Sequence, residues 1–205
     1  MKHGREAERA GGGEPSAAYL ALVGRSRGEL EEVLLRGARP DLDRLAGWEF
    51  RGMNTPAWAR AARIRKFAKG FERRGTGELF GYNRPVRQDA DQAPWQVTGD
   101  RFGWYRVGAV DPTARDNAYL HAALLDYGRG GNRPWSPTGV PPDASGSVFR
   151  RAVRWGSPSR GLRDYLVEVD GAGGELYLGK AYYALGPTRV AVGFFVLERL
   201  RPAPE

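Results

Sequence analysis

The chain has 205 residues, of which 41% are hydrophobic and 11% aromatic, and its formal net charge is +8. This composition predicts one folded domain with its own core and argues against global disorder. Cysteine is absent, and the two histidines are His3 and His121. Disulfides, thiolate zinc sites, cysteine nucleophiles and histidine-rich metal sites are therefore excluded, and we expect neither a metal nor a cofactor.

Residues 1–15 are rich in glycine, arginine and glutamate and are predicted to form a disordered tail before a single domain at 16–205. The tail lacks the apolar centre of a secretory signal, and the chain has no run of about 18 apolar residues that could span a membrane. The expected location is the cytoplasm.

Helices begin the domain. Residues 16–37 have a helical pattern, with a cap at Ser26, a stop at Gly37 and an apolar face made by Leu30, Val33 and Leu34. Residues 41–45 predict a further helical turn, and residues 46–52 predict the first strand.

Two patterns overlap after the first strand. Thr55-Pro56 predicts a helix start, because a hydroxyl can cap the helix and proline suits its first position. Alternate residues that follow fall on one face of a strand: Arg65, Phe67, Lys69 and Phe71. We favour a short helix to about Arg63 and a strand to about Arg73, because Gly-Thr-Gly at 75–77 can form a hairpin turn. A single helix through the whole segment is the alternative.

Strand-forming residues recur through the rest of the chain, and the predicted strands are 78–86, 101–110, 117–127, 162–169, 175–185 and 188–199. A long loop rich in glycine and proline is expected at 128–148, with a short helix at 147–154. Two long closing strands favour a sheet that the last strand seals. The predicted fold is mainly β with N-terminal helices (α+β), an antiparallel barrel of about eight strands.

The beginning and the end of the domain resemble known families. Gly47-Trp48 with Arg51-Gly52, and then Lys66 to Phe71, are similar to the opening of small bacterial proteins of unknown function that share a Gly-x-Trp-x-Gly motif. Trp48 departs from that motif because it follows Gly47 directly. The segments 167–170, 176–180 and 193–199 are similar to the C-terminal half of the same proteins.

A tryptophan near the first strand and an arginine that closes the last strand also resemble the calycins, the lipocalin and fatty-acid-binding group. This resemblance implies a calycin-like barrel with a small-molecule cavity. It also implies a structural role for Trp48 and Arg199, packed together across the bottom of the barrel.

Polar-tipped aromatic residues and cations alternate with apolar residues along the predicted strands. The pattern is typical of a polar-lined cavity, and equally of tyrosines at barrel rims and arginines on solvent faces. The candidate ligand-binding residues are Tyr82, Arg84, Trp104, Arg106, Tyr119, His121, Tyr127, Tyr165, Lys180 and Tyr182.

His121 is the candidate catalytic residue if the barrel is an enzyme. Alternation in the predicted strand 117–127 places it on one face with Tyr119 and Tyr127, where it could be a general base or a satisfied structural histidine. Acidic residues form no catalytic pattern. Asp164, Glu168 and Asp170 share one strand face at even spacing, which is typical of a solvated face.

Positive charge gathers in two segments. Residues 56–74 contain seven lysines and arginines with Glu72 as the single acid, and residues 145–163 contain five arginines and no acid. Such patches can steer anionic partners, but arginine-rich composition also arises without a functional reason.

Three functions follow from these patterns. We favour a carrier or sensor that binds a small hydrophobic, lipid-like or aromatic ligand, neutral or anionic, in the barrel. One alternative is an isomerase, cyclase or hydrolase on the same barrel that uses His121. The other is a nucleic-acid or anionic-surface binder that uses the patches at 56–74 and 145–163, with weak binding at high salt.

Overall fold

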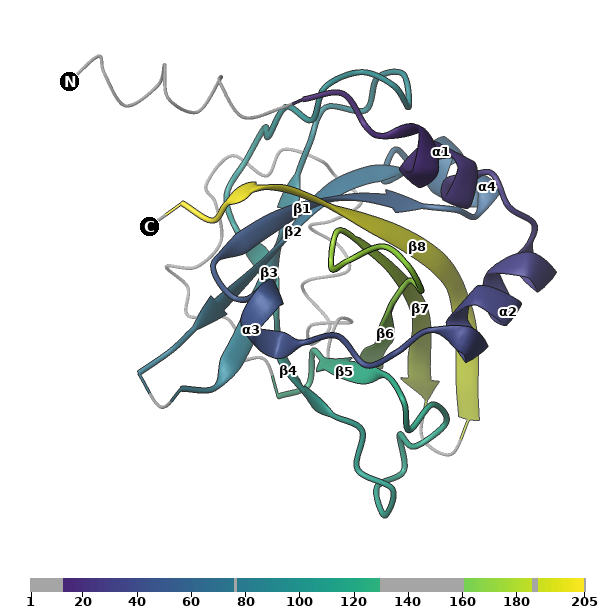
Figure 1. Cartoon of the computed structure of the whole chain (residues 1–205), viewed down its shortest axis with the longest axis vertical. Coiled ribbons are helices and arrows are strands. Elements are labelled where there is room, and N and C mark those ends of the chain that lie inside the picture. The colour runs from purple at the N-terminus through teal and green to yellow at the C-terminus, as the bar shows by residue number, and fades with distance from the viewer. Residues whose placement is uncertain (1–12, 76, 130–160, 186–187, 205) are drawn as a thin grey trace.

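The structure of the protein, a computed structural model, describes residues 13–75, 77–129, 161–185 and 188–204. Eight antiparallel strands follow one another in sequence order around a closed barrel, and the last strand pairs with the first (Figure 1). The predicted fold class, mainly β with N-terminal helices and a barrel of about eight strands, is confirmed. Most of the predicted tail and of the loop at 128–148, and all of the predicted helix at 147–154, lie outside the described residues.

The strands are β1 Trp48–Asn54, β2 Lys66–Arg73, β3 Leu79–Pro85, β4 Phe102–Ala109, β5 Ala123–Asp126, β6 Leu162–Glu168, β7 Leu176–Leu185 and β8 Thr188–Pro202. The helices are α1 Ala17–Val23, α2 Arg27–Arg36, α3 Leu42–Leu45 and α4 Ala57–Ala61. Because α4 ends at Ala61 and β2 begins at Lys66, the interpretation of this region as a short helix followed by a strand is confirmed.

The N-terminal helices begin where polar side chains can bond to their free N–H groups. Ser26 accepts a hydrogen bond from the Glu29 backbone N–H, and the Glu29 carboxylate accepts one from the Ser26 N–H, which completes a capping box on α2. Ser16 caps α1 through its hydroxyl, which accepts a hydrogen bond from the Tyr19 N–H at 3.1 Å. The predicted cap at Ser26 and stop at Gly37 are confirmed.

The predicted strand at 117–127 was too long, because β5 begins only at Ala123. Side chains turn the chain before that point. Asp111 accepts from the Thr113 N–H at 2.8 Å, and Asn117 donates to the Pro112 carbonyl at 2.9 Å. The Ala122 N–H then donates to the Tyr119 carbonyl at 3.0 Å. Tyr119 and His121 therefore do not share a strand face with Tyr127.

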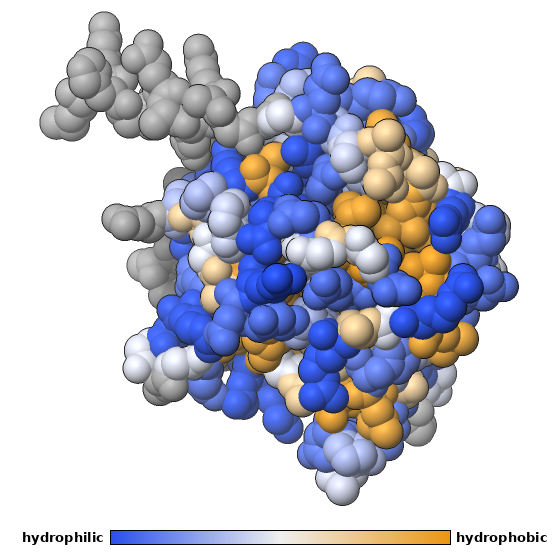
Figure 2. Space-filling model, in the orientation of Figure 1, coloured by the Kyte–Doolittle hydropathy of each residue, from blue (hydrophilic) through white to orange (hydrophobic). Residues whose placement is uncertain are grey.

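Two apolar cores lie on the two sides of the barrel wall. The inner core is built from aromatic rings in edge-to-face contact, with Phe50 5.4 Å from both Phe71 and Tyr177. The outer core lies where α1 and α2 pack on β7 and β8, and it includes Tyr19, Leu30, Leu34, Val167, Leu178 and Val196. Most of the face in Figure 2 is hydrophilic, with smaller apolar areas toward the upper right, where Figure 1 places α1 and α2.

Glycines on the inner face make room for large rings. A Cβ at Gly52 would lie 2.3 Å from the Phe67 ring, one at Gly81 2.1 Å from the Tyr105 ring, and one at Gly179 2.0 Å from the Phe195 ring. Each ring thus occupies the space over a glycine on a neighbouring strand, a pairing that also pins the strand register.

We expect Gly81→Ala to destabilise the protein by about 1–3 kcal/mol, because the added methyl group overlaps the Tyr105 ring in a packed interior. Gly108→Ala on β4 is the matched control, since a Cβ there meets no atom within 4 Å. Its effect should stay below about 1 kcal/mol. Urea unfolding of the two variants measures both values, and equal effects would contradict the packing described.

Candidate functional site

The inside of the barrel holds polar side chains among its aromatic rings. Lys69 on β2 and Asp164 on β6 meet across the interior, with Lys69 Nζ 3.3 Å from Asp164 Oδ2. Tyr127, which directly follows β5, joins them: Lys69 Nζ donates to its hydroxyl at 2.8 Å, and the hydroxyl lies 3.2 Å from Asp164 Oδ2. Asn83 Nδ2 on β3 is 3.3 Å from the same hydroxyl. We call Lys69, Asn83, Tyr127 and Asp164 the interior polar cluster.

Strand register brings these residues together. Lys69 pairs with Phe50 on β1 and with Asn83 on β3, so it points to the same side of the wall as the inner core. Asp164 pairs with Leu125 and Ala181, which also belong to that core. The two charges thus come from strands on different sides of the barrel and can meet only inside it.

Aromatic faces surround the ammonium group. Lys69 and Asp164 are each 2% exposed. Lys69 Nζ lies 4.3 Å from the centre of the Tyr105 ring and 5.2 Å from that of Phe195. Ring faces stabilise a cation in this position, although more weakly than the water that burial removes.

Burial shifts the pKa values of the pair toward the neutral forms. Desolvation lowers the pKa of Lys69 below its ordinary value, despite the nearby Asp164. Desolvation likewise raises the pKa of Asp164, despite Lys69 and the hydrogen bond from Tyr127. The two directions agree: burial moves both groups toward the neutral pair, in which the proton has moved from Lys69 to Asp164. Burial and the Asp164 charge also raise the pKa of Tyr127, which keeps its hydroxyl protonated.

One carboxylate oxygen of the interior polar cluster lacks a hydrogen-bond donor. Asp164 Oδ2 is bonded by Lys69 and Tyr127, whereas Asp164 Oδ1 is buried without a hydrogen-bond partner. A buried acceptor left without a donor costs about 1–3 kcal/mol. A molecule that brings a hydroxyl or N–H group to Oδ1 would recover that free energy.

Sequence reasoning missed the chemical importance of Lys69, Asn83 and Asp164. Asp164 was expected on a solvated face, which is wrong, because β6 turns that face into the barrel. A signal for Lys69 was present: it stands between Phe67 and Phe71 on one strand face, where a solvent-facing strand would not place two large rings.

Of the ten predicted ligand-binding residues, Tyr127 faces the interior. Four others lie on the outer wall, and two of them, Tyr82 and Arg84, contact Glu49, which is fully buried there. Tyr82 donates to Glu49 Oε1 at 3.0 Å, and its ring is 5.2 Å from that of Trp104. Arg84 lies 3.5 Å from the Glu49 carboxylate, while Arg106 pairs with Glu78 at 2.5 Å. These contacts tie strands together along the outside of the barrel.

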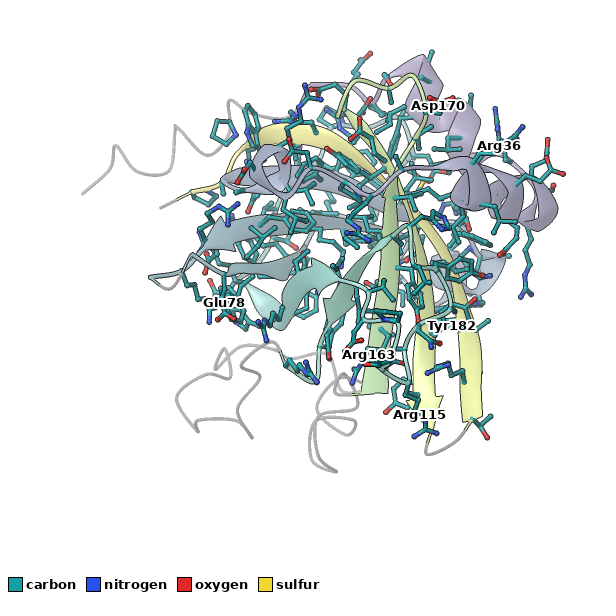
Figure 3. The ribbon with its side chains drawn as sticks, turned by 60° about the horizontal axis from the view of Figure 1, so that its bottom comes forward. Arg36, Glu78, Arg115, Arg163, Asp170 and Tyr182 are labelled. Carbon is teal, nitrogen blue, oxygen red and sulfur yellow. The ribbon has the colours of Figure 1, made fainter. Side chains whose placement is uncertain are left out.

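The other five residues lie on the outer wall beside α2. Lys180 Nζ donates to Glu31 Oε2 at 2.5 Å and to the Tyr119 hydroxyl at 2.7 Å, and Tyr119 donates to Glu31 Oε1 at 2.7 Å. The rings of Tyr165 and Tyr182 pack beside them (Tyr182 is labelled in Figure 3). This group fastens α2 to β7.

The candidate catalytic residue, His121, lies next to the same group. Its Nε2 is 2.9 Å from the Leu34 carbonyl, so the Nε2–H donates to the backbone of α2. The ring of Tyr119 is 6.2 Å from its own. The contacts of His121 therefore link the turn before β5 to α2, outside the barrel.

Trp48 and Arg199 meet at one end of the barrel. The Arg199 guanidinium lies 4.4 Å from the centre of the Trp48 ring. It also donates to the Arg44 and Gly174 carbonyls at 3.1 Å each. This contact lies at the end of the barrel near α3, where Leu45 joins the inner core. The resemblance to calycins implies such packing of Trp48 against Arg199.

Most cations of the basic segment 56–74 have acidic partners within the protein. Six of its seven lysines and arginines pair with carboxylates, and the pairs are Arg60 and Arg65 with Asp91, Lys66 with Asp89, Lys69 with Asp164, Arg73 with Asp43 and Arg74 with Glu72. Pairing weakens the field that an anionic partner would meet. The segment 145–163 lies almost wholly outside the described residues.

A shallow concave region of about 440 Å³ lies on the outer wall where residues 14–18 meet β1, β7 and β8. Its central charges already bond to each other: Arg51 Nε is 3.1 Å from Glu198 Oε2, and the Ser16 N–H donates to the same carboxylate. The charge of Arg51 is thus neutralised by Glu198 within the protein.

No protein-family model matches the chain, and no curated protein or solved structure matches it either. The resemblances to the Gly-x-Trp-x-Gly proteins and to the calycins stay predictions. Within the described ranges, no three histidine, aspartate or glutamate side chains gather as metal ligands. No helix in that part of the chain has the length and apolar character needed to cross a membrane.

We expect Lys69→Met to destabilise the protein by about 3–5 kcal/mol, because it leaves Asp164 buried without its counter-charge. Adding Asp164→Asn should restore part of this loss, since the second change removes the unpaired charge. Urea unfolding of both singles and the double variant gives the coupling free energy. Additive effects would show that the two charges do not interact inside the barrel.

A second prediction concerns Glu31, Lys180 and Tyr119, whose hydrogen bonds fasten α2 to β7. Burial opposes ionisation of Glu31, but hydrogen bonds from Lys180 and Tyr119 outweigh it and hold the pKa of Glu31 below the ordinary 4.5. A lowered folded-state pKa contributes stability above pH 4.5 that is lost as the pH falls through the folded value. Glu31→Gln should therefore destabilise the protein at pH 6 and have a smaller effect at pH 3, measured as the difference in Tm. A pH-independent difference would contradict this account.

Proposed function

We propose that the protein binds a small hydrophobic or aromatic molecule inside the barrel, at the interior polar cluster. The observation that carries this proposal is the buried Asp164 Oδ1, which has no hydrogen-bond donor, although Lys69 and Tyr127 bond to the other oxygen and aromatic rings lie around the Lys69 ammonium group. Ligand sites of this kind combine an apolar lining with a few polar groups that orient the ligand.

The polar groups favour one ligand chemistry. Asp164 Oδ1 needs a donor, which a hydroxyl or N–H group on the ligand would supply. An anionic group suits the site less well, because it would compete with Asp164 for Lys69 and would place two negative charges together. The ligand we propose is therefore a neutral aromatic or aliphatic compound that carries a hydroxyl or N–H group.

Space for such a ligand can come from Phe67. This ring lies over Gly52 and is only partly buried, unlike the rings deeper in the barrel. It is also 5.9 Å from Lys69 Nζ. Rotation of Phe67 away from Gly52 would vacate the volume of one ring next to the interior polar cluster. The proposed ligand-binding end is therefore the one away from Trp48 and Arg199, since Phe67 pairs with Gly52 near one end of β1 and Trp48 lies at the other.

Tyr127→Phe tests the proposal without removing a charge or a ring. The change deletes the hydroxyl that bonds Lys69, Asn83 and Asp164, so we expect binding to weaken by about tenfold or more. Tyr105→Phe is the matched control. It also removes a buried hydroxyl from the inner core, but that hydroxyl donates to the Gly70 carbonyl rather than to the interior polar cluster.

The ligand for this test comes from mass spectrometry of an organic extract of the purified, salt-washed protein, and benzyl alcohol, phenol and indole serve as defined probes. Binding is measured by native mass spectrometry and by the shift in Tm. Equal weakening by Tyr127→Phe and Tyr105→Phe, or no binding of any extracted compound or probe, would contradict the proposed site.

A further inference from the structure

Lys69 differs from the other lysines of the described chain in what surrounds its nitrogen. Lys66 Nζ has three oxygen acceptors, Asp89 Oδ1 at 2.5 Å and the Ala90 and Ala93 carbonyls at 3.1 Å. Lys180 Nζ lies between Glu31 and Tyr119 on the outer wall. Aromatic rings lie near all three nitrogens. Lys69 Nζ differs in its acidic partner: the Asp164 side chain is 3% exposed, against 27% for Asp89 and 32% for Glu31, and its Oδ1 has no hydrogen-bond donor.

We propose that Lys69 is a nucleophilic amine that forms a reversible imine with an aldehyde or ketone group of a ligand in the barrel. This inference rests on the proposed function, because the carbonyl compound must first occupy the interior. It adds a covalent step and a substrate class, carbonyl compounds, to a site otherwise described as a binding site.

The groups needed for the step stand next to the nitrogen. Lys69 gives a proton to Asp164, and the free amine attacks the carbonyl carbon, so that an N–C bond forms while the C=O π electrons move to oxygen. Asp164 returns a proton to that oxygen and takes one from nitrogen, which gives a neutral carbinolamine. It then protonates the hydroxyl, which leaves as water while the C=N bond forms and nitrogen loses its last proton to Asp164. The balance is amine plus carbonyl to imine plus water, with no oxidant or reductant.

The position of Asp164 Oδ1 supports this role. A carboxyl that moves protons needs one oxygen to hold the amine and another to face the ligand oxygen. Oδ2 is held by Lys69 and Tyr127, and Oδ1 has no partner within the protein. Burial also lowers the pKa of Lys69 and raises that of Asp164, the directions that favour a free amine beside a protonated carboxyl.

Reductive trapping tests the step. The folded protein is incubated with benzaldehyde and sodium cyanoborohydride, which converts an imine into a stable benzylamine, and the modified lysines are located by peptide mass mapping. The chain has four lysines, Lys2, Lys66, Lys69 and Lys180, so the sites are readily distinguished. We expect Lys69 to be benzylated about tenfold or more faster than Lys66 and Lys180. In urea, where the barrel is unfolded, all three should react at similar rates.

Benzyl alcohol separates this inference from the proposed function, because it can occupy the same site but cannot form an imine. Binding of benzyl alcohol with no trapping at Lys69 overturns the imine and leaves the binding function intact. If benzyl alcohol does not bind and benzaldehyde is not trapped at Lys69, both the binding function and the imine are overturned. Trapping of benzaldehyde at Lys69 that benzyl alcohol inhibits supports both the binding function and the imine.

Asp164→Asn tests the proton transfers, since it keeps the shape of the side chain and removes its proton chemistry. At saturating benzaldehyde the trapping rate at Lys69 should fall about 100-fold, while the rates at Lys66 and Lys180 stay unchanged. Should this variant not fold, Tyr127→Phe keeps both charges and removes a hydrogen bond to each; a fall of at least about tenfold in its trapping rate is expected. An unchanged rate at Lys69 in the folded variant would overturn the assignment.

Discussion

The Lys69–Asp164 contact is the interaction on which the inside of the barrel depends. Each side chain is buried, and neither charge could remain there alone. Because the residues come from β2 and β6, the contact fixes how these strands face each other. A shift of either strand by one residue would turn its charge to the outside and leave the partner unpaired. The pair thus fixes the register of β2 and β6. The same two side chains carry the chemistry we propose.

The wall of this barrel is buried on both sides where the helices cover it. β7 and β8 contribute Tyr177 and Phe195 to the inner core, and Leu178 and Val196 to the outer core. Polar groups under the helices must then find partners within the protein, which explains the close bonding of Lys180, Glu31 and Tyr119. The outer clusters hold the scaffold together, whereas the interior polar cluster leaves one acceptor unused.

Sequence patterns were sufficient for the fold class and most strands, because alternation, the capping box and hairpin turns are local signals. They could not separate the inside from the outside of a wall whose two faces are both apolar, so tyrosines such as Tyr165 and Tyr182 resembled cavity residues. The strand at 117–127 was overextended because its composition suits a strand while Asp111 and Asn117 turn the backbone. The partner of Lys69 lies 95 residues away, and no local pattern connects them.

The pairing of β1 with β8 also determines when the protein can finish folding. Residues 48–54 meet residues 195–202, so the chain must be synthesised as far as β8 before the ring of strands can close. Until then β1 and β7 keep unpaired edges, and the lysine on β2 has no enclosed environment. Contacts between such distant segments slow folding and prolong the exposure of aggregation-prone strand edges. We therefore expect the N-terminal helices and the β1–β3 meander to form first, and the enclosed surroundings of Lys69 to form last, when β8 closes the barrel.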